Sequence, residues 1–234
     1  HNKKLRTGAL TGNRFELTLR QVTHCDALIE RWQTIVEQGV PNYFGEQRFG
    51  IDGGNIEKAK TLFSGTKVKD KKKRGIYLSA ARSYLFNDLV SQRIEHQHFM
   101  QLFAGDVCML AGTQSVFLAD EIDDKLANRL LEKDIDITAP MWGAGDLMTK
   151  GDVLAFEQAI AQKHEDIAEG LPRFGLKQER RRIRLCLSDA EIQVNEAEQS
   201  VTLGFVLPAG CYATTILREL LDYQDMTERA SIAN

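Results

Sequence analysis

The chain has 234 residues, 43% of them hydrophobic and 27% charged, with a formal net charge of −3. This length can bury a substantial core in one or two domains, and the composition is ordinary for a globular protein. A membrane-spanning helix is excluded, because no apolar run approaches the roughly 20 residues that one needs. The four cysteines stand far apart without a Cys-x-x-Cys pair, which favours reduced thiols in a cytoplasmic protein over disulfides or a metal framework.

The first part of the chain predicts a strand followed by helices. Residues 13–22 alternate apolar and polar side chains, which is the pattern of a strand with one buried face. Residues 27–38 carry apolar residues at helical spacing, and Gly39 and Pro41 end that helix. The elements expected next are a loop at 40–50, a helix at 53–63, a polar domain boundary at 65–75 and a long helix at 76–99.

The remainder mixes short strands with helices. The elements expected in chain order are short strands within 107–119, a helix at 120–132, a strand at 135–138, a loop at 140–145, a helix at 153–167 and a basic helix at 176–184. Residues 191–195 and 200–206 alternate in polarity around an acidic turn, which predicts a hairpin, and residues 212–221 predict a last helix. Strands at both ends then enclose a mostly helical middle, so the simplest topology is one domain interrupted by another.

Basic residues gather in three clusters although the net charge is negative. The clusters are Lys3, Lys4 and Arg6; Lys67, Lys69, Lys71, Lys72, Lys73 and Arg74; and Arg173, Lys177, Arg180, Arg181, Arg182 and Arg184. Such clusters are often solvated loops or helix faces. They are also the pattern of a surface that binds nucleic acid, because contacts to phosphate supply most of the non-specific affinity.

The stretch Val40–Gly50 has an unusual mixture of side chains. It combines Asn42, the adjacent rings of Tyr43 and Phe44, Arg48 and two glycines. A buried strand would not carry so many polar groups, and a solvent-exposed loop would not need so many rings. The mixture suits a rigid loop that offers a ring face and a polar group to a flat ligand such as a nucleobase. Stacking of one base on an aromatic ring contributes roughly 1–3 kcal/mol.

Four segments carry motifs of one enzyme family. Residues 5–15 read LRTGALTGNRF, residues 40–50 read VPNYFGEQRFG, residues 78–87 read LSAARSYLFN and residues 207–220 read LPAGCYATTILREL. Together and in this order they resemble the TruD family of transfer-RNA pseudouridine synthases, and they span almost the whole chain. His1 also fits the family pattern.

The resemblance implies an α+β fold. An incomplete, pseudouridine-synthase-like mixed-sheet catalytic domain would carry an inserted, mostly helical α/β domain of the TRUD type. The catalytic domain would comprise residues 1–67, truncated at the N-terminus, and residues 189–234, with the inserted domain at 68–188. Arg82 and Asn87 would anchor the region near the domain junction. They are five positions apart on one helix and do not share a face, so we expect them to do different jobs.

The resemblance also implies an activity, the isomerisation of uridine 13 to pseudouridine in transfer RNA, notably that for glutamate, in the cytoplasm and without metal or cofactor. The family's nucleophilic aspartate belongs to a Gly-x-Lys-Asp-x-x-Ala motif that does not occur in this sequence. We therefore expect the chain by itself to be inactive. It opens at His1 in mid-domain, and a truncated product, a proteolytic fragment and the ordered part of a longer chain are all open explanations.

Two other functions are open. A non-catalytic RNA-binding or interaction fragment would keep the basic clusters, and a small-molecule enzyme on a similar core would show a closed pocket without a basic rim. A metal role for His96 and His98 is not expected, because no third ligand accompanies them. The expected partner is transfer RNA, with no membrane and no metal.

In the family pattern, Asn42 and Phe44 occupy positions that support the active site. Phe44 would stack on the base, and Asn42, which is both donor and acceptor, would bridge the catalytic carboxylate and the backbone. The plain alternatives are that Phe44 is a core ring, that Asn42 caps a turn after Pro41, and that Arg48 pairs with a carboxylate of its own domain. The further possible substrate contacts are Gln47, Arg48, Lys71, Lys72, Lys73, Arg74, Arg180 and Arg181.

Overall fold

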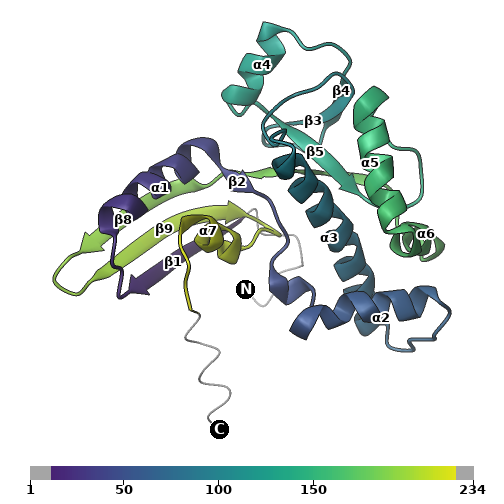
Figure 1. The fold of residues 1–234 in the computed structure, drawn as a ribbon, viewed down its shortest axis with the longest axis horizontal. Coiled ribbons are helices and arrows are strands. Elements are labelled where there is room, and N and C mark those ends of the chain that lie inside the picture. The colour runs from purple at the N-terminus through teal and green to yellow at the C-terminus, as the bar shows by residue number, and fades with distance from the viewer. Residues whose placement is uncertain (1–11, 225–234) are drawn as a thin grey trace, which may run out of the picture. The chain divides into compact units, whose positions relative to one another are not determined.

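The computed structural model describes residues 12–224, which divide into two compact units (Figure 1). Unit 1 combines residues 12–40 and 185–224, and unit 2 is the continuous segment 41–184. Helices and strands occur in both units, which confirms the α+β class. No helix within residues 12–224 combines the length and the apolar character needed to cross a membrane. The basic residues Lys3, Lys4 and Arg6 and most of the first motif lie outside the described residues.

The chain passes between the units at two short strands, β2 (Val40–Pro41) and β7 (Arg184–Leu185). The first passage lies before the predicted domain boundary at residue 67, and the second lies close to the predicted boundary at residue 188. A compact unit need not coincide with a functional domain, so the assignment of residues 1–67 and 189–234 to the catalytic domain stays a prediction.

Unit 1 is built on a three-stranded antiparallel sheet in the order β1–β9–β8. Its strands are β1 (Gly12–Arg20), β8 (Ser188–Asn195) and β9 (Ser200–Pro208). The predicted hairpin at the end of the chain is present as β8 and β9. The first predicted strand, β1, pairs with β9 along its whole length, so the two ends of the described chain form one sheet.

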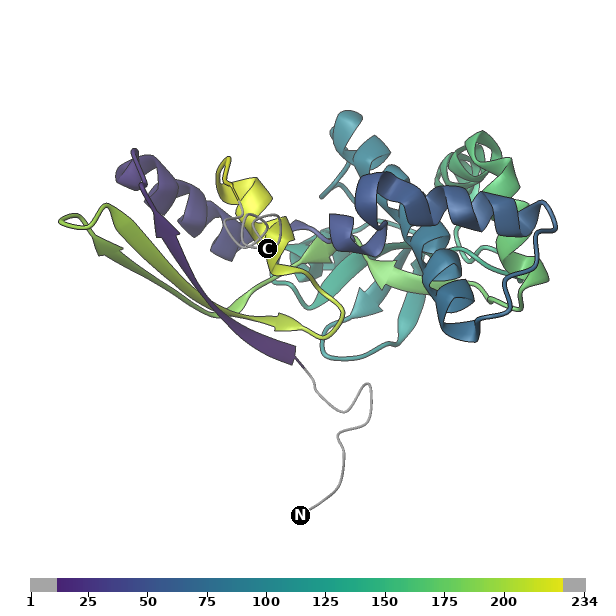
Figure 2. The ribbon, with the colours of Figure 1, turned by 90° about the horizontal axis from the view of Figure 1, so that it is seen from below.

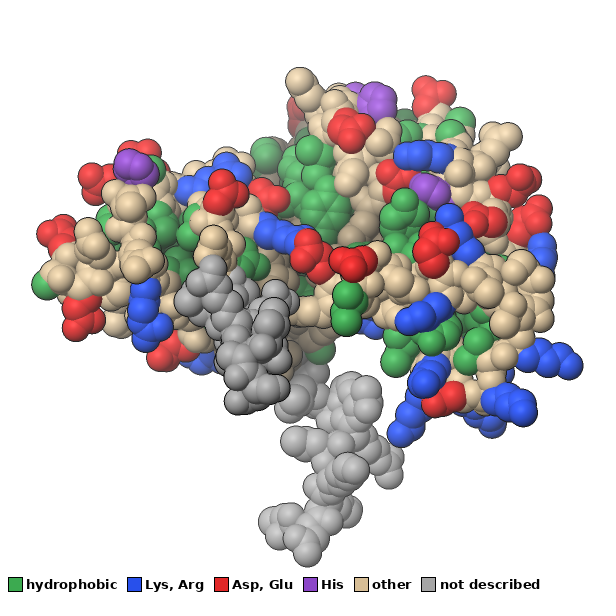
Figure 3. Space-filling view, turned by 60° about the horizontal axis from the view of Figure 1, so that its bottom comes forward, with side chains coloured by type: hydrophobic (Ala, Val, Ile, Leu, Met, Phe, Trp, Pro, Cys, Tyr) green, Lys and Arg blue, Asp and Glu red, His purple; other side chains and the backbone are tan. Residues whose placement is uncertain are grey.

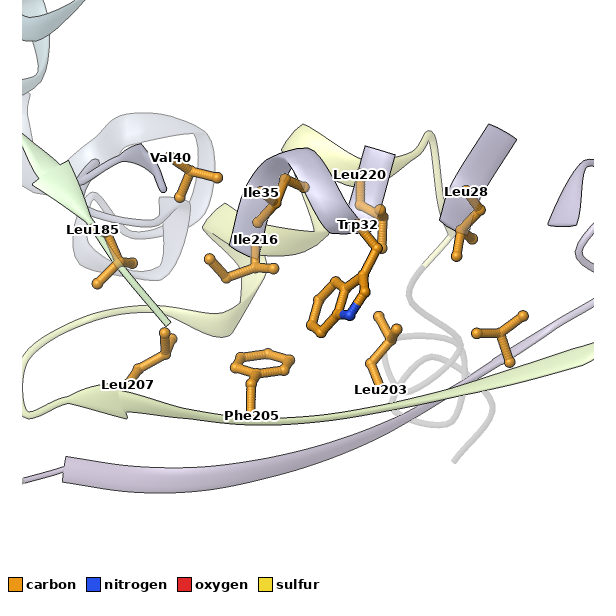
Figure 4. Packing of buried hydrophobic residues seen from close by; sticks show 11 residues of the cluster. Leu28, Trp32, Ile35, Val40, Leu185, Leu203, Phe205, Leu207, Ile216 and Leu220 are labelled. Carbon is orange, nitrogen blue, oxygen red and sulfur yellow. The ribbon is translucent and has the colours of Figure 1, made fainter. Parts of the chain in front are cut away.

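One face of this sheet is covered by α1 (Cys25–Gln38) and α7 (Ala213–Leu220), as Figure 2 shows. Alternate residues of β9 and one side of α1 are buried in this layer. This burial accounts for the alternating apolar residues of the strand and for the helical spacing of the apolar residues in α1. The ring centroids of Trp32 and Phe205 lie 5.9 Å apart at its centre. The buried cluster, drawn in Figure 4, comprises Leu28, Trp32, Ile35, Val40, Leu185, Val201, Leu203, Phe205, Leu207, Ile216 and Leu220.

Unit 2 contains a four-stranded antiparallel sheet in the order β4–β3–β5–β6. Its strands are β3 (Asp106–Leu110), β4 (Val116–Ala119), β5 (Ile135–Met141) and β6 (Glu179–Arg182). The predicted basic helix at 176–184 is wrong, because β6 occupies this segment. The predicted loop at 140–145 is wrong at its start, since β5 continues to Met141. Two arginines of β6, Arg180 and Arg182, pair with carboxylates inside the unit. A run of charge that is typical of a solvated helix is therefore a strand here.

Three helices of unit 2 pack around a second core. They are α2 (Gly54–Phe63), α3 (Lys71–Glu95) and α6 (Glu165–Arg173). Their buried residues are Ala59, Leu62, Leu78, Ala81, Leu85, Ile167 and Leu171. The unit also contains α4 (Asp124–Leu131) and α5 (Gly151–Lys163), and two short 3₁₀ turns, η1 (Glu46–Arg48) and η2 (Ile51–Gly53), which lead into α2.

The observed helices depart from the predicted ones at three places. Asp123 accepts a hydrogen bond from the backbone N–H of Leu126 at 2.7 Å, so α4 begins at Asp124 rather than at Asp120. The single helix predicted at 153–167 is two helices, because His164 has non-helical φ and ψ of −122° and 47°. The polar boundary predicted at 65–75 ends earlier, because α3 begins at Lys71.

The start of α3 depends on Asp70. Its Oδ1 accepts hydrogen bonds from the backbone N–H groups of Lys72 at 2.8 Å and Lys73 at 3.2 Å. Replacing Asp70 by Ala should lower the free energy of unfolding by about 1 kcal/mol, because two backbone donors lose their partner. Asp70→Asn should change it by no more than a few tenths of a kcal/mol, since asparagine caps about as well. Urea unfolding of both variants measures the difference, and equal stability of the two would contradict a capping role.

Candidate functional site

Asn42 is held by three consecutive residues of the β6 region. Its backbone N–H donates to the carbonyl oxygen of Ile183 at 2.7 Å. Its Nδ2 donates to the carbonyl oxygen of Arg182 at 2.9 Å, and its Oδ1 accepts from Nη2 of Arg181 at 2.7 Å. Asn42 is only 5% exposed. The side-chain bonds span 140 and 139 residues of sequence, so Asn42 does more than cap the turn after Pro41.

Phe44 lies in the same enclosed region and is 7% exposed. Its ring meets the ring of Phe86 edge to face, with centroids 5.6 Å apart. The guanidinium carbon of Arg181 lies 4.1 Å from the Phe44 centroid, and that of Arg48 lies 5.5 Å from it. A ring face open to a nucleobase, which the sequence predicts, is therefore not present in this structure. Phe44 is a buried ring, as in the plain alternative, but one bordered by two cations.

The long helix α3 fixes the loop that carries these residues. Asn87 accepts a hydrogen bond from the backbone N–H of Phe44 at 2.9 Å and donates one to its carbonyl oxygen at 2.9 Å. Arg48 donates to Oγ of Ser79 at 2.9 Å. The motifs at 40–50 and 78–87 are thus in contact. The sequence predicts an anchoring role for Asn87, but it does not reveal that Phe44 is what Asn87 holds.

The end of the loop depends on a glycine. Gly50 has φ of 75°, and a Cβ placed there would lie 2.8 Å from Nδ2 of Asn55. Asn55 in turn donates to the carbonyl oxygen of Arg48 at 3.3 Å. Gly50 therefore serves both the backbone conformation and the close approach of Asn55. Gln47, also predicted as a substrate contact, is exposed on η1.

Arg180 does not offer its charge to a ligand, which corrects its prediction as a substrate contact. Its side chain is 5% exposed and that of Glu157 is 2% exposed. Its two terminal nitrogens contact the Glu157 carboxylate at 2.9–3.1 Å, and its Nε donates to Oγ1 of Thr138 at 2.9 Å. Glu157 also accepts from Thr149 at 2.8 Å. This buried network holds β5, β6 and α5 together.

The other arginines of the third cluster are also engaged within unit 2. Arg184 is buried and donates to Asp136 at 2.6 Å, and Arg182 donates to the carbonyl oxygen of Leu110 at 2.6 Å. Burial raises the pKa of Asp136 above its usual value, against the opposing effect of Arg184. Among these residues only Arg181 reaches Asn42 and Phe44 through its side chain.

Arg82 serves a different segment from Asn87, although both lie on α3. Its Nη2 donates to the carbonyl oxygens of Met141, at 2.7 Å, and Lys177. Its Nη1 pairs with Glu179 at 3.0 Å. Burial lowers the pKa of Arg82, and Glu179 opposes this effect. Arg82 therefore connects α3 to β5 and β6, whereas Asn87 connects α3 to the loop of Phe44.

The second basic cluster, in contrast, is at the surface. Lys67, Lys69, Lys71, Lys72 and Lys73 are exposed, and Arg74 is half-buried. Four of these residues, Lys71–Arg74, form the first turn of α3, which contains no acidic residue; we call them the α3 basic turn. Figure 3 shows a group of Lys and Arg side chains at its lower right, where α2 leads into α3. The charges of the three lysines are therefore open to solvent.

Residues 12–224 contain no group of three or more His, Cys, Asp or Glu side chains arranged to hold a metal ion. The rings of His96 and His98 lie 6.0 Å apart and pack on neighbouring rings of Phe156 and Phe103. Burial, reinforced by the charge of Asp106, raises the pKa of the Cys108 thiol to about 12, so this cysteine stays protonated and unreactive near neutral pH.

Comparisons with known proteins agree on one family. The family model described as tRNA pseudouridine synthase D (TruD) matches residues 1–59 and 56–220. A protein of Colwellia psychrerythraea named tRNA pseudouridine synthase D is 65% identical over 237 residues, covering 98% of this chain and 65% of that protein. A protein of the same name from Shewanella oneidensis is 49% identical over 229 residues, covering 97% of this chain and 61% of that protein.

The fold has a counterpart among solved structures. A crystal structure from Methanosarcina mazei, described as a candidate tRNA pseudouridine synthase D, matches with a TM-score of 0.68 at 19% sequence identity. The match covers 93% of this chain and 70% of that chain. The chain spans a little under two thirds of the length of the curated relatives described above.

Proposed function

Because this chain belongs to the TruD family of transfer-RNA pseudouridine synthases, we propose that the protein containing it isomerises uridine to pseudouridine in transfer RNA. The observation that carries the proposal is the 65% identity to a named tRNA pseudouridine synthase D over 98% of this chain. The proposed target is uridine 13, notably in the transfer RNA for glutamate, and the proposed location is the cytoplasm. No metal or cofactor takes part in the proposed reaction.

The reaction breaks an N-glycosidic bond and rejoins the same base through carbon. It requires a carboxylate that acts as nucleophile or base on a flipped nucleoside, and fixed polar groups that orient it. We assign Asn42 and Phe44 to the support of this site. The Nδ2 and Oδ1 atoms of Asn42 are both held by hydrogen bonds, which fixes the orientation of its amide beside the proposed site. Because Phe44 is enclosed, its part is to hold the loop in shape rather than to offer a free stacking face.

The α3 basic turn is the proposed contact to RNA phosphates. A helix N-terminus carries a partial positive charge, so cations there are unfavourable by about 0.3–1 kcal/mol each. Lys71, Lys72 and Lys73 are nonetheless exposed in the first turn. An anionic partner would offset that cost. We keep Gln47 and Arg48 as further candidates near the RNA, and the inserted domain at 68–188 as the proposed carrier of this contact.

A non-catalytic RNA-binding fragment is the alternative for residues 1–234 taken alone. The exposed α3 basic turn favours it, since RNA contact there does not need the family's Gly-x-Lys-Asp-x-x-Ala motif, which this sequence lacks. Binding by such a fragment should be sensitive to salt and poor in sequence specificity.

One assay tests the function and the alternative. The full-length protein and residues 1–234 alone are each incubated with transfer RNA for glutamate, and pseudouridine is mapped by position. We expect conversion of uridine 13 by the full-length protein and none by residues 1–234, which should still bind the RNA. A full-length protein that binds the RNA without forming pseudouridine would contradict the proposed function, and turnover by residues 1–234 would contradict the expected inactivity.

A further inference from the structure

Arg181 is the one residue of the β6 arginine run whose side chain reaches the loop of Asn42 and Phe44. On the basis of the function proposed above, we propose that Arg181 is a positioning residue of the uridine site. It acts through Asn42 and Phe44 and not as a contact to RNA phosphate. The sequence alone places it among the possible substrate contacts, so the structure assigns it a different role.

The position of Arg181 on its strand explains its direction. Arg181 lies opposite Ala139 in the register of β6 with β5. Side chains alternate between the two faces of a strand. Arg180 reaches Glu157, Arg182 reaches the carbonyl oxygen of Leu110, and Arg181 between them reaches the loop. The paired strand therefore delivers the guanidinium to Asn42 from a rigid backbone.

The contacts of Arg181 determine the orientation of the Asn42 amide. The Oδ1 of Asn42 accepts from Arg181 at 2.7 Å while its Nδ2 donates to the carbonyl oxygen of Arg182 at 2.9 Å. If the amide were rotated by 180°, its Nδ2 would face the donor of Arg181 and its Oδ1 would face the carbonyl oxygen of Arg182. Arg181 thus selects which atom of Asn42 points in each direction.

The same guanidinium stacks on the aromatic rings. Its carbon lies 4.1 Å from the centroid of Phe44 and 5.5 Å from that of Phe86. A planar guanidinium can donate in its plane and stack through its face at the same time, whereas the ammonium of lysine is a point charge without a face. Lysine at this position would keep the positive charge but lose this double engagement, which makes Arg181→Lys the informative change.

The test compares Arg181→Lys and Arg181→Gln with Arg129→Lys and Arg129→Gln in the full-length protein. Arg129 is a matched control outside the basic clusters and the four motifs, because it also pairs with a polar partner, Asp134 at 2.6 Å, and lies over a ring, that of Phe117. Single-turnover and steady-state pseudouridine formation give kcat and KM, hydrogen exchange reports the backbone amides of residues 42–48, and thermal unfolding checks that each variant is folded.

We expect Arg181→Lys to lower kcat by on the order of 10- to 100-fold, with KM within about twofold of wild type, because small displacements of aligned groups are costly. Exchange at 42–48 should rise, and both Arg129 variants should match wild type. A raised KM with a normal kcat and a reduced salt dependence would overturn the proposal in favour of a phosphate contact. Unchanged kcat and exchange would also overturn it.

The proposed function and the proposed role of Arg181 can fail separately. If wild-type protein forms no pseudouridine, the proposed function is wrong, and hydrogen exchange at 42–48 still decides whether Arg181 positions the loop. If Arg181→Gln does not fold, Arg181→Lys alone tests the proposal. Its kinetics and hydrogen exchange then support or overturn the proposal by the results stated above.

Discussion

Glu157→Gln should destabilise unit 2 by about 3–5 kcal/mol, because it leaves the guanidinium of Arg180 buried without its countercharge. The pair is enclosed, with side chains 5% and 2% exposed, and all its contacts are short. Glutamine keeps the size of the side chain, so the effect reports the lost charge rather than a cavity. Urea unfolding gives the free energy directly.

Glu169→Gln is the control for this experiment. It breaks a Glu–Arg pair in the same unit whose side chains are 59% and 60% exposed. Exposed pairs contribute about 0–1 kcal/mol, so this variant should be close to wild type. The double variant Glu157→Leu with Arg180→Met should recover much of the loss, since apolar replacement of a buried pair is often neutral. A Glu157→Gln protein within 1 kcal/mol of wild type would mean that Arg180 is hydrated and free to meet a substrate.

Changing Lys71, Lys72 and Lys73 together to Gln should weaken RNA binding by about 10- to 100-fold at low salt. The slope of log K against log salt should become shallower by about one for each lysine that contacts a phosphate. Glutamine has nearly the helix propensity of lysine, and the change removes three cations from the positive end of the helix. The free energy of unfolding should therefore be equal or slightly higher. Fluorescence anisotropy across a salt series measures both quantities.

A second triple variant separates local from total charge. Changing Lys125, Lys133 and Lys150 to Gln removes the same net charge from the α4 and α5 side of unit 2. If the α3 basic turn contacts RNA, this variant should bind within about twofold of wild type. Equal loss in the two triple variants would contradict a local contact and leave only a general charge effect.

The elements with a clear hydrophobic period are predictable from this sequence. The pattern from Phe15 to Leu19 and the hairpin at the end of the chain both appear as strands, and α1, α2 and α7 lie within a few residues of their predicted bounds. Their periods arise from one buried face, and that face exists in the structure as the layer around Trp32 and Phe205. What the pattern could not give is the pairing of β1 with β9, which depends on residues far apart in the chain.

The β6 segment shows why charge patterns mislead. Consecutive arginines are typical of an exposed helix, yet Arg180 and Arg184 are buried against Glu157 and Asp136. Nothing near these arginines in the sequence identifies either carboxylate as a partner. Only the assembled sheet brings them together, so a predicted ligand-binding surface is an internal network.

The candidate site was predictable as a segment but not as a set of contacts. The side chains of residues 40–50 indicate a special loop, and the four motifs indicate the family. The open ring face expected for Phe44 is absent, because Arg181 and Arg48 lie beside the ring. A motif records which residues occur together, whereas exposure depends on neighbours from elsewhere in the chain.

The contacts of Asn42 have a consequence for how the protein is made. Its partners in the β6 region follow it by about 140 residues in the sequence. The sequence separation between β1 and its partner strand β9 is larger still. At typical rates of translation, the ribosome delivers these partners on the order of ten seconds or more after the loop itself. The apolar face of β1 is therefore exposed to aggregation for that time during synthesis, before β9 can pair with it.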